Sequence, residues 1–154
     1  MNIIAVILIL GILLAVVLLL TNRRTARDAD WPYYSKKPLS KPEQILFHRL
    51  VKALPECIVL AQVQLSRVLG VKKGHNFGHW NNRINRMSLD FVICLKDSAI
   101  VAAIELDDGS HARPDRRVAD AKKEIALKSA GIPLIRWNVS SIPSEQEIRD
   151  AIAK

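Results

Sequence analysis

Residues 88–107, SLDFVICLKDSAIVAAIELD, decide the fold of this chain. The two halves, residues 88–95 and 100–107, are rich in apolar and β-branched side chains and are typical of strands. The polar residues 96–98 between them have the composition of a tight turn. The two halves are therefore predicted to pair as a hairpin.

The stretches around this hairpin alternate between helical and extended patterns. Amphipathic spacing with end signals predicts helices, and β-rich runs predict strands. A basic and aromatic segment without a clear period, residues 66–86, is predicted as a long loop. The order α-β-β-β-α-β-α predicts an α/β domain with a mixed sheet and helices on its faces. The helices are predicted at 42–54, 112–131 and 144–154, and the further strands at 57–65 and 132–137.

An uninterrupted apolar run precedes this domain. The run Ile3–Leu20 has 18 residues and no charge. At about 1.5 Å per residue, such a helix is just long enough for a hydrocarbon core of about 30 Å. Residues 1–21 are predicted to be a transmembrane anchor, 22–40 a basic juxtamembrane linker and 41–154 the globular domain. A cleaved signal peptide is the alternative, but it requires a basic segment before the apolar run.

The distribution of charge bears on the side of the membrane and on the compartment. Six Lys or Arg and two Asp lie in residues 21–41, so this tract carries half of the formal net charge of +8. Positive charge after an apolar helix favours the cytoplasmic side, which the globular domain is therefore predicted to face. The spacing of Cys57 and Cys94 fits no disulfide scaffold, and both are predicted to be reduced core thiols. A chain of 154 residues with one modest core excludes a multidomain enzyme.

Carboxylates gather at one end of the predicted hairpin. The period of a strand places Glu105 and Asp107 on one face, and Asp90 is expected near the same end of the neighbouring strand. Such oxygens repel one another unless a divalent cation such as Mg²⁺ or Mn²⁺ lies between them. His111 follows, where an imidazole could pass protons at neutral pH. The alternative is a polar turn, with Asp90 capping a strand and Glu105 paired to Arg136.

A longer pattern includes several of these residues. It consists of Asp90-Phe91-Val92, Ile104-Glu105-Leu106-Asp107-Asp108-Gly109, His111, Asp120, Lys123, Glu124, Leu127, Gly131 and Leu134-Ile135-Arg136-Trp137. This pattern resembles the PD-(D/E)XK nuclease superfamily. The likeness runs from Pro42 to Trp137 and is greatest to the very-short-patch-repair-endonuclease-like branch, within it to the bacterial domain of unknown function 2726. It implies a restriction-endonuclease-like α-β-β-β-α-β core, which agrees with the order predicted above.

The resemblance implies a role for each candidate acid. Asp90 and Glu105 match the metal-binding acids of two core strands, and with Asp107 they are the implied ligands of Mg²⁺ or Mn²⁺. Asp107 stands where many members carry lysine; because relatives with this variant have a downstream histidine, His111 is the candidate for proton transfer. Glu43 matches an acid that points into the site, although the helix dipole also favours an acid in a first turn. The candidate catalytic residues are Asp90, Glu105, Asp107, His111 and Glu43.

Basic and aromatic residues predict a nucleic-acid contact. The loop combines cations with stackable rings, as a nucleic-acid contact would. Lys123 and Arg136 match the family pattern and could contact a phosphate. For Lys123 the alternative is a solvated face, and for Arg136 a salt bridge to Glu105 or Asp120. The candidate nucleic-acid-binding residues are Arg136, Lys123, Lys72, Lys73, Trp80 and Arg83.

These expectations combine into a leading hypothesis and two alternatives. The leading hypothesis is a single-pass protein of the bacterial inner membrane, anchored by residues 3–20. Its cytoplasmic domain is expected to hydrolyse a phosphodiester bond of nucleic acid with Mg²⁺ or Mn²⁺. The expected nucleic acid is DNA. The first alternative is a catalytically inactive module of the same fold that binds nucleic acid or a protein. The second is a cytoplasmic partner in a complex assembled through the membrane helix.

Overall fold

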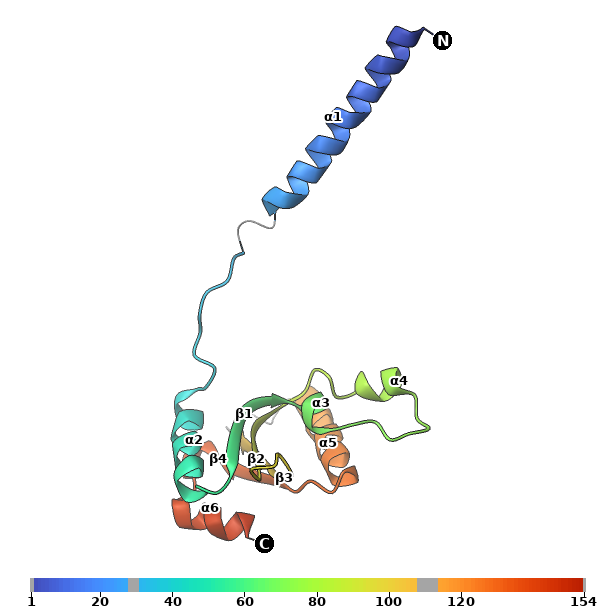
Figure 1. The fold of residues 1–154 in the computed structure, drawn as a ribbon. Helices are drawn as coiled ribbons and strands as arrows, with labels where there is room; N and C mark the ends of the chain where they lie inside the picture. Colours follow the sequence, from blue (N-terminus) through green and yellow to red (C-terminus); the bar gives the residue numbers. More distant parts are fainter. Residues whose placement is uncertain (1, 28–30, 108–113, 154) are drawn as a thin grey trace. The chain divides into compact units, whose positions relative to one another are not determined.

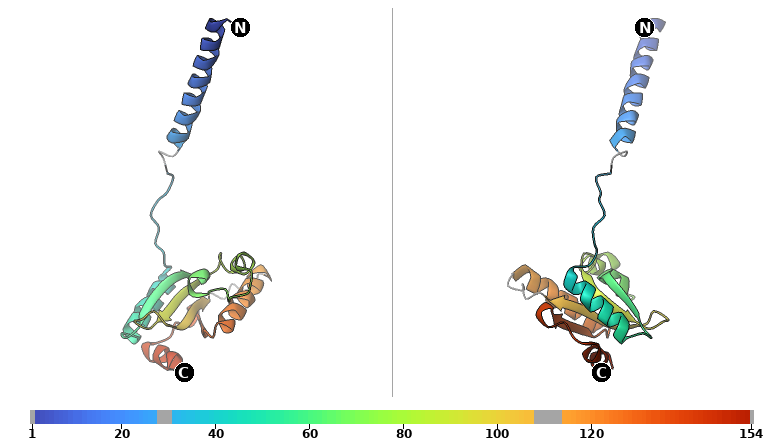
Figure 2. Two further views of the ribbon diagram at one scale, coloured as in Figure 1. Left: turned by 45° about the vertical axis from the view of Figure 1, so that its right-hand side comes forward. Right: turned by 90° about the vertical axis from the view of Figure 1, so that its left-hand side faces the viewer.

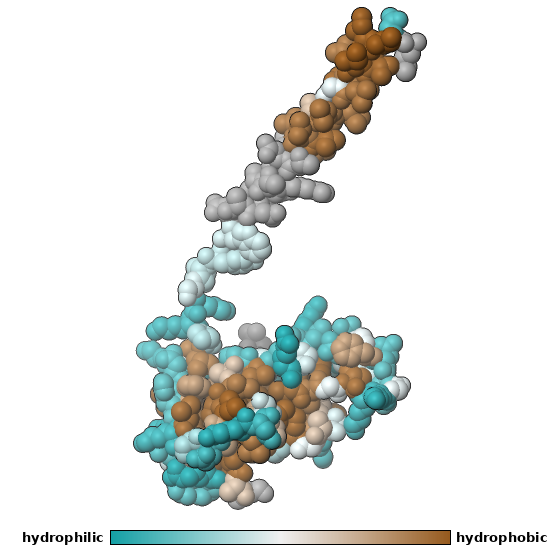
Figure 3. Space-filling model, in the orientation of Figure 1, coloured by the Kyte–Doolittle hydropathy of each residue, from teal (hydrophilic) through white to brown (hydrophobic). Residues whose placement is uncertain are grey.

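The computed structural model describes residues 2–27, 31–107 and 114–153, and it divides into two units, Met1–Lys36 and Lys37–Lys154. The first unit contains helix α1 (Ile3–Arg27), whose apolar surface is brown in Figure 3. Its window Ile3–Leu20 has a mean hydropathy of 3.6 and no buried residue. By length and composition, α1 can cross a membrane. The helix continues to Arg27, so the start of the predicted linker is helical.

The second unit is built on a four-stranded sheet in the order β1-β2-β3-β4 (Figure 1). β1 pairs with β2 and β2 with β3 in antiparallel fashion, whereas β4 runs parallel to β3. The sheet is therefore mixed, as the sequence predicts. The strands are β1 (Ile58–Gln64), β2 (Ser88–Cys94), β3 (Ile100–Asp107) and β4 (Leu134–Asn138).

The hairpin of β2 and β3 closes where the sequence predicts it. The backbone N–H of Leu95 donates to the carbonyl of Ala99 at 2.8 Å, and the N–H of Ser98 donates to the carbonyl of Leu95 at 2.9 Å. The Asp97 side chain accepts a hydrogen bond from the Ala99 N–H at 2.9 Å. Ser98 adopts a φ of +70°, a left-handed conformation that tight turns demand and that glycine adopts at lower cost.

Helices cover both faces of this sheet, as Figures 1 and 2 show. Phe91 packs with residues of α2 and α6, whereas its neighbour Val92 packs with Leu127 of α5. Because successive strand residues point to opposite faces, the sheet separates two buried clusters and the unit has three layers. The helices are α2 (Lys41–Ala53), α5 (Pro114–Ser129) and α6 (Glu145–Ile152), and a 3-10 turn, η1 (Val139–Ser141), follows β4.

The β1–β2 connection, which the sequence predicts as a long loop, includes helical turns. It contains two short helices, α3 (Leu65–Val68) and α4 (Phe77–Asn81). Leu65 is fully buried against the sheet, and the Asn76 side chain caps α4 by accepting a hydrogen bond from the His79 N–H at 2.9 Å. Helices of one turn are too short to show a helical period, so the pattern resembled that of a loop.

The two cysteines agree with the prediction of unpaired thiols. Cys57 is half-buried and Cys94 is buried, and both are free. Burial is the main cause that raises the pKa of the Cys94 thiol. A buried thiol of this kind behaves as a small apolar side chain.

Candidate functional site

Two carboxylates meet where β2 begins and β3 ends. The antiparallel register pairs Phe91 with Ile104, so the next position along the ladder sets Asp90 opposite Glu105. Asp90 Oδ2 accepts a hydrogen bond from the backbone N–H of Leu106 at 2.8 Å. The Asp90 side chain is thereby held against the strand that carries Glu105 and Asp107.

A lysine from α5 lies between the layers at this point. Lys123 Nζ donates to both Oε1 and Oε2 of Glu105 at 2.8 Å, and each side chain is only 12% exposed. An ion pair with so little exposure is weakly screened by water and salt. Of the expectations for Lys123, the solvated face is therefore not what this structure shows. Lys123 therefore belongs, with Asp90, Glu105 and Asp107, to one cluster of side chains, the acidic group.

The pKa of Asp90 depends on its burial and on the charges around it. Burial, the largest cause, raises this pKa above the ordinary value, and the charges of Glu43 and Asp107 raise it further. The Leu106 N–H and the charge of Lys123 lower it, but they do not compensate fully. The Asp90 carboxyl consequently holds a proton more readily than an exposed aspartate.

The pKa of Glu105 is raised for the same principal reason. Burial favours the neutral carboxyl, and the negative charges of Asp90 and Asp107 add to this effect. The hydrogen bonds and positive charge of Lys123 act in the opposite direction. Asp90, Glu105, Asp107 and Lys123 therefore form one electrostatically coupled group.

Glu43 is shared between its own helix and the neighbouring strand. Its Oε2 accepts a hydrogen bond from the Ser40 N–H at 2.5 Å, which caps α2. Its Oε1 accepts a hydrogen bond from Gln62 Nε2 at 2.8 Å. Glu43 lies in the first turn of α2, where the helix dipole favours an acid, and its charge also raises the pKa of Asp90.

Gln62 is the residue of this group that sequence reasoning missed. The pairs Ala61–Phe91 and Val63–Leu89 flank it, so Gln62 stands opposite Asp90 in the sheet. Its φ is +53°, a conformation that few residues other than glycine adopt. Such strained positions in a strand are enriched at functional sites. A glutamine in an alternating strand gives no signal of this conformation in the sequence.

These carboxylates do not form a ready cation site. Carboxylate oxygens are the ligands that Mg²⁺ prefers, so the chemistry of the donors is suitable. Among the residues whose side chains the structure describes, however, no three His, Cys, Asp or Glu are arranged to hold one ion. Both oxygens of Glu105 are bonded to Lys123 instead. The expected set of Asp90, Glu105 and Asp107 therefore does not fit a divalent cation in this arrangement.

The remaining predicted site residues lie in three different situations. Asp107 ends β3, and its charge acts on both Asp90 and Glu105. His111 lies outside the described residues. Arg136 Nη1 is 3.0 Å from Glu124 Oε2 on α5, so its ion pair is with an acid other than the two expected. This pair is largely exposed and contributes little to stability.

The predicted basic loop residues lie in the connection between β1 and β2. Lys72 and Lys73 are exposed, and the Arg83 guanidinium lies 4.5 Å from the centroid of the Trp80 ring. This connection leaves the sheet after Gln64 and returns at Ser88. The connection therefore starts and ends at the end of the sheet where Gln62, Asp90 and the last residues of β3 lie.

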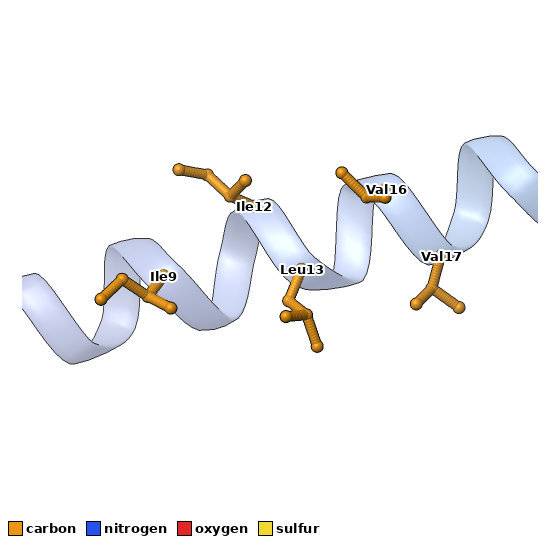
Figure 4. A pocket seen from close by; sticks show the side chains of 5 residues that line it. All are labelled: Ile9, Ile12, Leu13, Val16 and Val17. Carbon is orange, nitrogen blue, oxygen red and sulfur yellow. The ribbon is translucent and has the colours of Figure 1, made fainter.

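An apolar hollow along α1 is not a candidate site. Figure 4 shows Ile12 and Val16 along one side of the helix ribbon and Leu13 and Val17 along the other. These side chains offer no polar group that could orient a ligand, and a single helix forms the hollow. The candidate catalytic and nucleic-acid-binding residues that the structure describes all lie in the second unit.

Most of the chain matches a family of known sequences. A family model described as protein of unknown function (DUF2726) matches residues 35–154, which include the whole sheet and every residue of the acidic group. No curated protein and no solved structure matches the chain.

Proposed function

This chain belongs to the family of protein of unknown function (DUF2726), and from that premise we propose that its second unit is a PD-(D/E)XK-like domain that hydrolyses a phosphodiester bond of nucleic acid. Family membership alone assigns no activity. The observation that carries the proposal is the coupled group of Asp90, Glu105 and Lys123. It combines carboxyls of raised pKa with a weakly exposed ammonium.

The proposed chemistry uses each of these groups. The Lys123 ammonium would offset the negative charge that grows on the phosphate oxygens as water attacks phosphorus. The Asp90 carboxylate would accept the proton of that water, since its raised pKa makes it a better base than an exposed aspartate. The new bond joins water oxygen to phosphorus, the bond to one sugar oxygen breaks, and that oxygen takes a proton from solvent.

Mg²⁺ and Mn²⁺ stay in the proposal as cofactors to be tested. A bound divalent cation would supply further charge neutralisation at the phosphate. Because the acidic group does not fit such an ion as arranged, no step is assigned to it. A cation that used Glu105 would have to replace Lys123 on that carboxylate.

The location proposed for this activity is the cytoplasmic face of the bacterial inner membrane. One helix among the described residues, α1, is long and apolar enough to span it once. Arg23 and Arg24 follow the apolar window, and positive residues favour the cytoplasmic side. Anionic lipid would attract the same residues.

The test is cleavage by the full chain in detergent micelles. Plasmid DNA, single-stranded DNA and RNA are incubated with Mg²⁺, Mn²⁺ or EDTA, using wild type, Asp90→Asn, Lys123→Met and the control Lys122→Met. Lys122 is an exposed neighbour of Lys123 on the same helix. The proposal expects cleavage by wild type and by the control, with a loss of about 100-fold or more in the two site variants. Equal cleavage by all four proteins would show a contaminant and overturn it.

A second candidate is a module of the same fold that binds nucleic acid without cleaving it. The observation that favours it is the Lys123–Glu105 pair, which already satisfies the carboxylate. Binding of an oligonucleotide without cleavage under every metal condition would establish this candidate.

A further inference from the structure

The connection between β1 and β2 has a distinctive charge. Residues 65–87 include five Lys or Arg and two His but no Asp or Glu. The absence of acids extends from Cys57 to Leu89. A surface segment that carries positive side chains and no negative ones is suited to binding a polyanion. The cations are Arg67, Lys72, Lys73, Arg83 and Arg86.

Aromatic rings are exposed among these cations. Phe77 and Trp80 are 65% and 43% exposed, although both are large apolar side chains. Figure 3 shows the mixture of apolar and hydrophilic side chains around α4. The rings of His75 and His79 meet the Trp80 ring edge-on, with centroids 6.1 and 5.6 Å away. Trp80 is therefore the centre of an aromatic cluster that also carries the Arg83 cation.

A hydrogen bond holds the connection at the end of the sheet that carries the acidic group. Gln64 Nε2 donates a hydrogen bond to the carbonyl of Asn85, which ties the end of β1 to the end of the connection. Gln62 lies two residues before Gln64, and Asp90 lies two residues after Ser88. A nucleic-acid strand bound along the connection would lead toward this end of the sheet.

We propose that residues 65–87 bind nucleic acid with unpaired bases, which stack on Phe77 and Trp80 while Lys72, Lys73 and Arg83 contact phosphates. This inference rests on the proposed function in naming the substrate class. Bases of a duplex are stacked on one another and present no free face to an aromatic ring, whereas those of a single strand do. Anionic lipid would use the cations but has no planar group for the rings. The rings therefore favour the single strand over the membrane surface.

The test is fluorescence anisotropy of a labelled single-stranded oligonucleotide with the full chain in detergent micelles. EDTA and the Asp90→Asn background keep any cleavage out of the measurement. Because a base stacked on an aromatic ring adds to the affinity, Trp80→Ala should weaken binding about tenfold and Trp80→Phe should restore most of it. The control is Trp31→Ala, an exposed tryptophan of the other unit, which should leave binding unchanged. Circular dichroism confirms that the variants are folded.

Salt dependence provides a second measurement. Each phosphate contact on a single strand adds about 0.7 to the slope of log K against log salt, so changing Lys72 and Lys73 to Gln should lower the slope by about 1.4. The exposed pair Lys122 and Lys128 serves as the matched control. A duplex of equal charge that binds as tightly as the single strand, or binding that ignores Trp80→Ala, would overturn the inference. So would Trp80-dependent binding to phosphatidylglycerol vesicles without oligonucleotide binding.

The outcomes separate this inference from the proposed function. Single-strand binding that depends on Trp80, with no cleavage by wild type under any metal, supports the surface and removes the hydrolytic role. Cleavage that depends on Asp90 and Lys123 but not on Trp80 supports hydrolysis and removes the surface.

Discussion

Lys123 Nζ on α5 bonds to both carboxylate oxygens of Glu105 on β3, and each side chain is 12% exposed. The two residues are 18 positions apart in the chain and belong to different layers. The lysine is the cation that the acidic end of the hairpin requires. This relationship explains why two carboxylates can face each other across β2 and β3.

Lys123→Met should destabilise the second unit. The substitution keeps most of the side-chain volume but leaves Glu105 without its cation. Removing one partner of a buried pair costs about 3–5 kcal/mol, and the partial exposure here reduces the expected loss to about 2 kcal/mol at neutral pH. Urea unfolding followed by circular dichroism measures it. Lys122→Met should change the free energy of unfolding by less than about 0.5 kcal/mol, and equal losses in both variants would contradict this role.

The same substitution should make the acidic group responsive to divalent cations. In wild type, Lys123 already bonds to both oxygens of Glu105, so millimolar Mn²⁺ is expected to raise the Tm of the second unit less than in the variant. In Lys123→Met, the uncompensated carboxylates attract a cation, and a ligand that binds only the folded state raises the Tm. Thermal unfolding with Mn²⁺ and after EDTA shows the difference. A rise in wild type as large as in the variant would contradict it.

Asp90→Asn should stabilise the fold at neutral pH. Burial, together with Glu43 and Asp107, raises the pKa of the Asp90 carboxyl, so the folded state binds its proton more tightly than the unfolded state does. Such a group favours folding fully only below its unfolded pKa and loses this contribution as the pH rises through the folded pKa. The amide has no charge to desolvate, and its oxygen can still accept from the Leu106 N–H.

The measurement for Asp90→Asn is the Tm of variant and wild type as a function of pH. The variant should be more stable by a few degrees at neutral pH, and its advantage should shrink as the pH falls toward the ordinary pKa of aspartate, 3.8. An advantage that grows toward acid pH would show that the sign is wrong.

Ser98→Gly should stabilise the hairpin turn. Ser98 has a φ of +70°, where glycine avoids the cost that other residues meet. Part of this gain is offset because glycine loses more entropy on folding, so the expected increase is about 0.5–1 kcal/mol. Chemical unfolding measures it. Ala99→Gly, at a neighbour without a positive φ, should instead destabilise the protein.

Glu43→Ala should loosen the contact between α2 and β1. The substitution removes the acceptor of both the Ser40 N–H and the Gln62 side chain. Loss of the cap interaction costs about 1 kcal/mol, and Glu43→Gln should recover part of it because an amide oxygen can still accept. Unfolding of the two variants side by side distinguishes this role. Equal stability of Glu43→Ala and wild type would show that neither hydrogen bond matters.

Local patterns in the sequence were sufficient for the strands, the hairpin turn and the main helices. The run of residues 100–107 becomes β3 with the predicted bounds, because β-branched side chains and the polar turn act over a few residues. The capping box that begins α6 is equally local, with the Ser144 N–H donating to Glu147 Oε2 at 2.7 Å across three positions. The apolar window of α1 was equally evident, since a candidate span is recognised by its length and composition alone.

The partners within the acidic group were decided by the tertiary structure. That Lys123 pairs with Glu105, and Arg136 with Glu124, depends on how α5 is placed over the sheet. Gln62 adopts a positive φ between two ladder pairs of unchanged register, Ala61–Phe91 and Val63–Leu89, and no local pattern in the sequence indicates it. Sequence periodicity determines which face of an element is buried, but the choice among several possible ion partners requires the distances that only packing between layers creates.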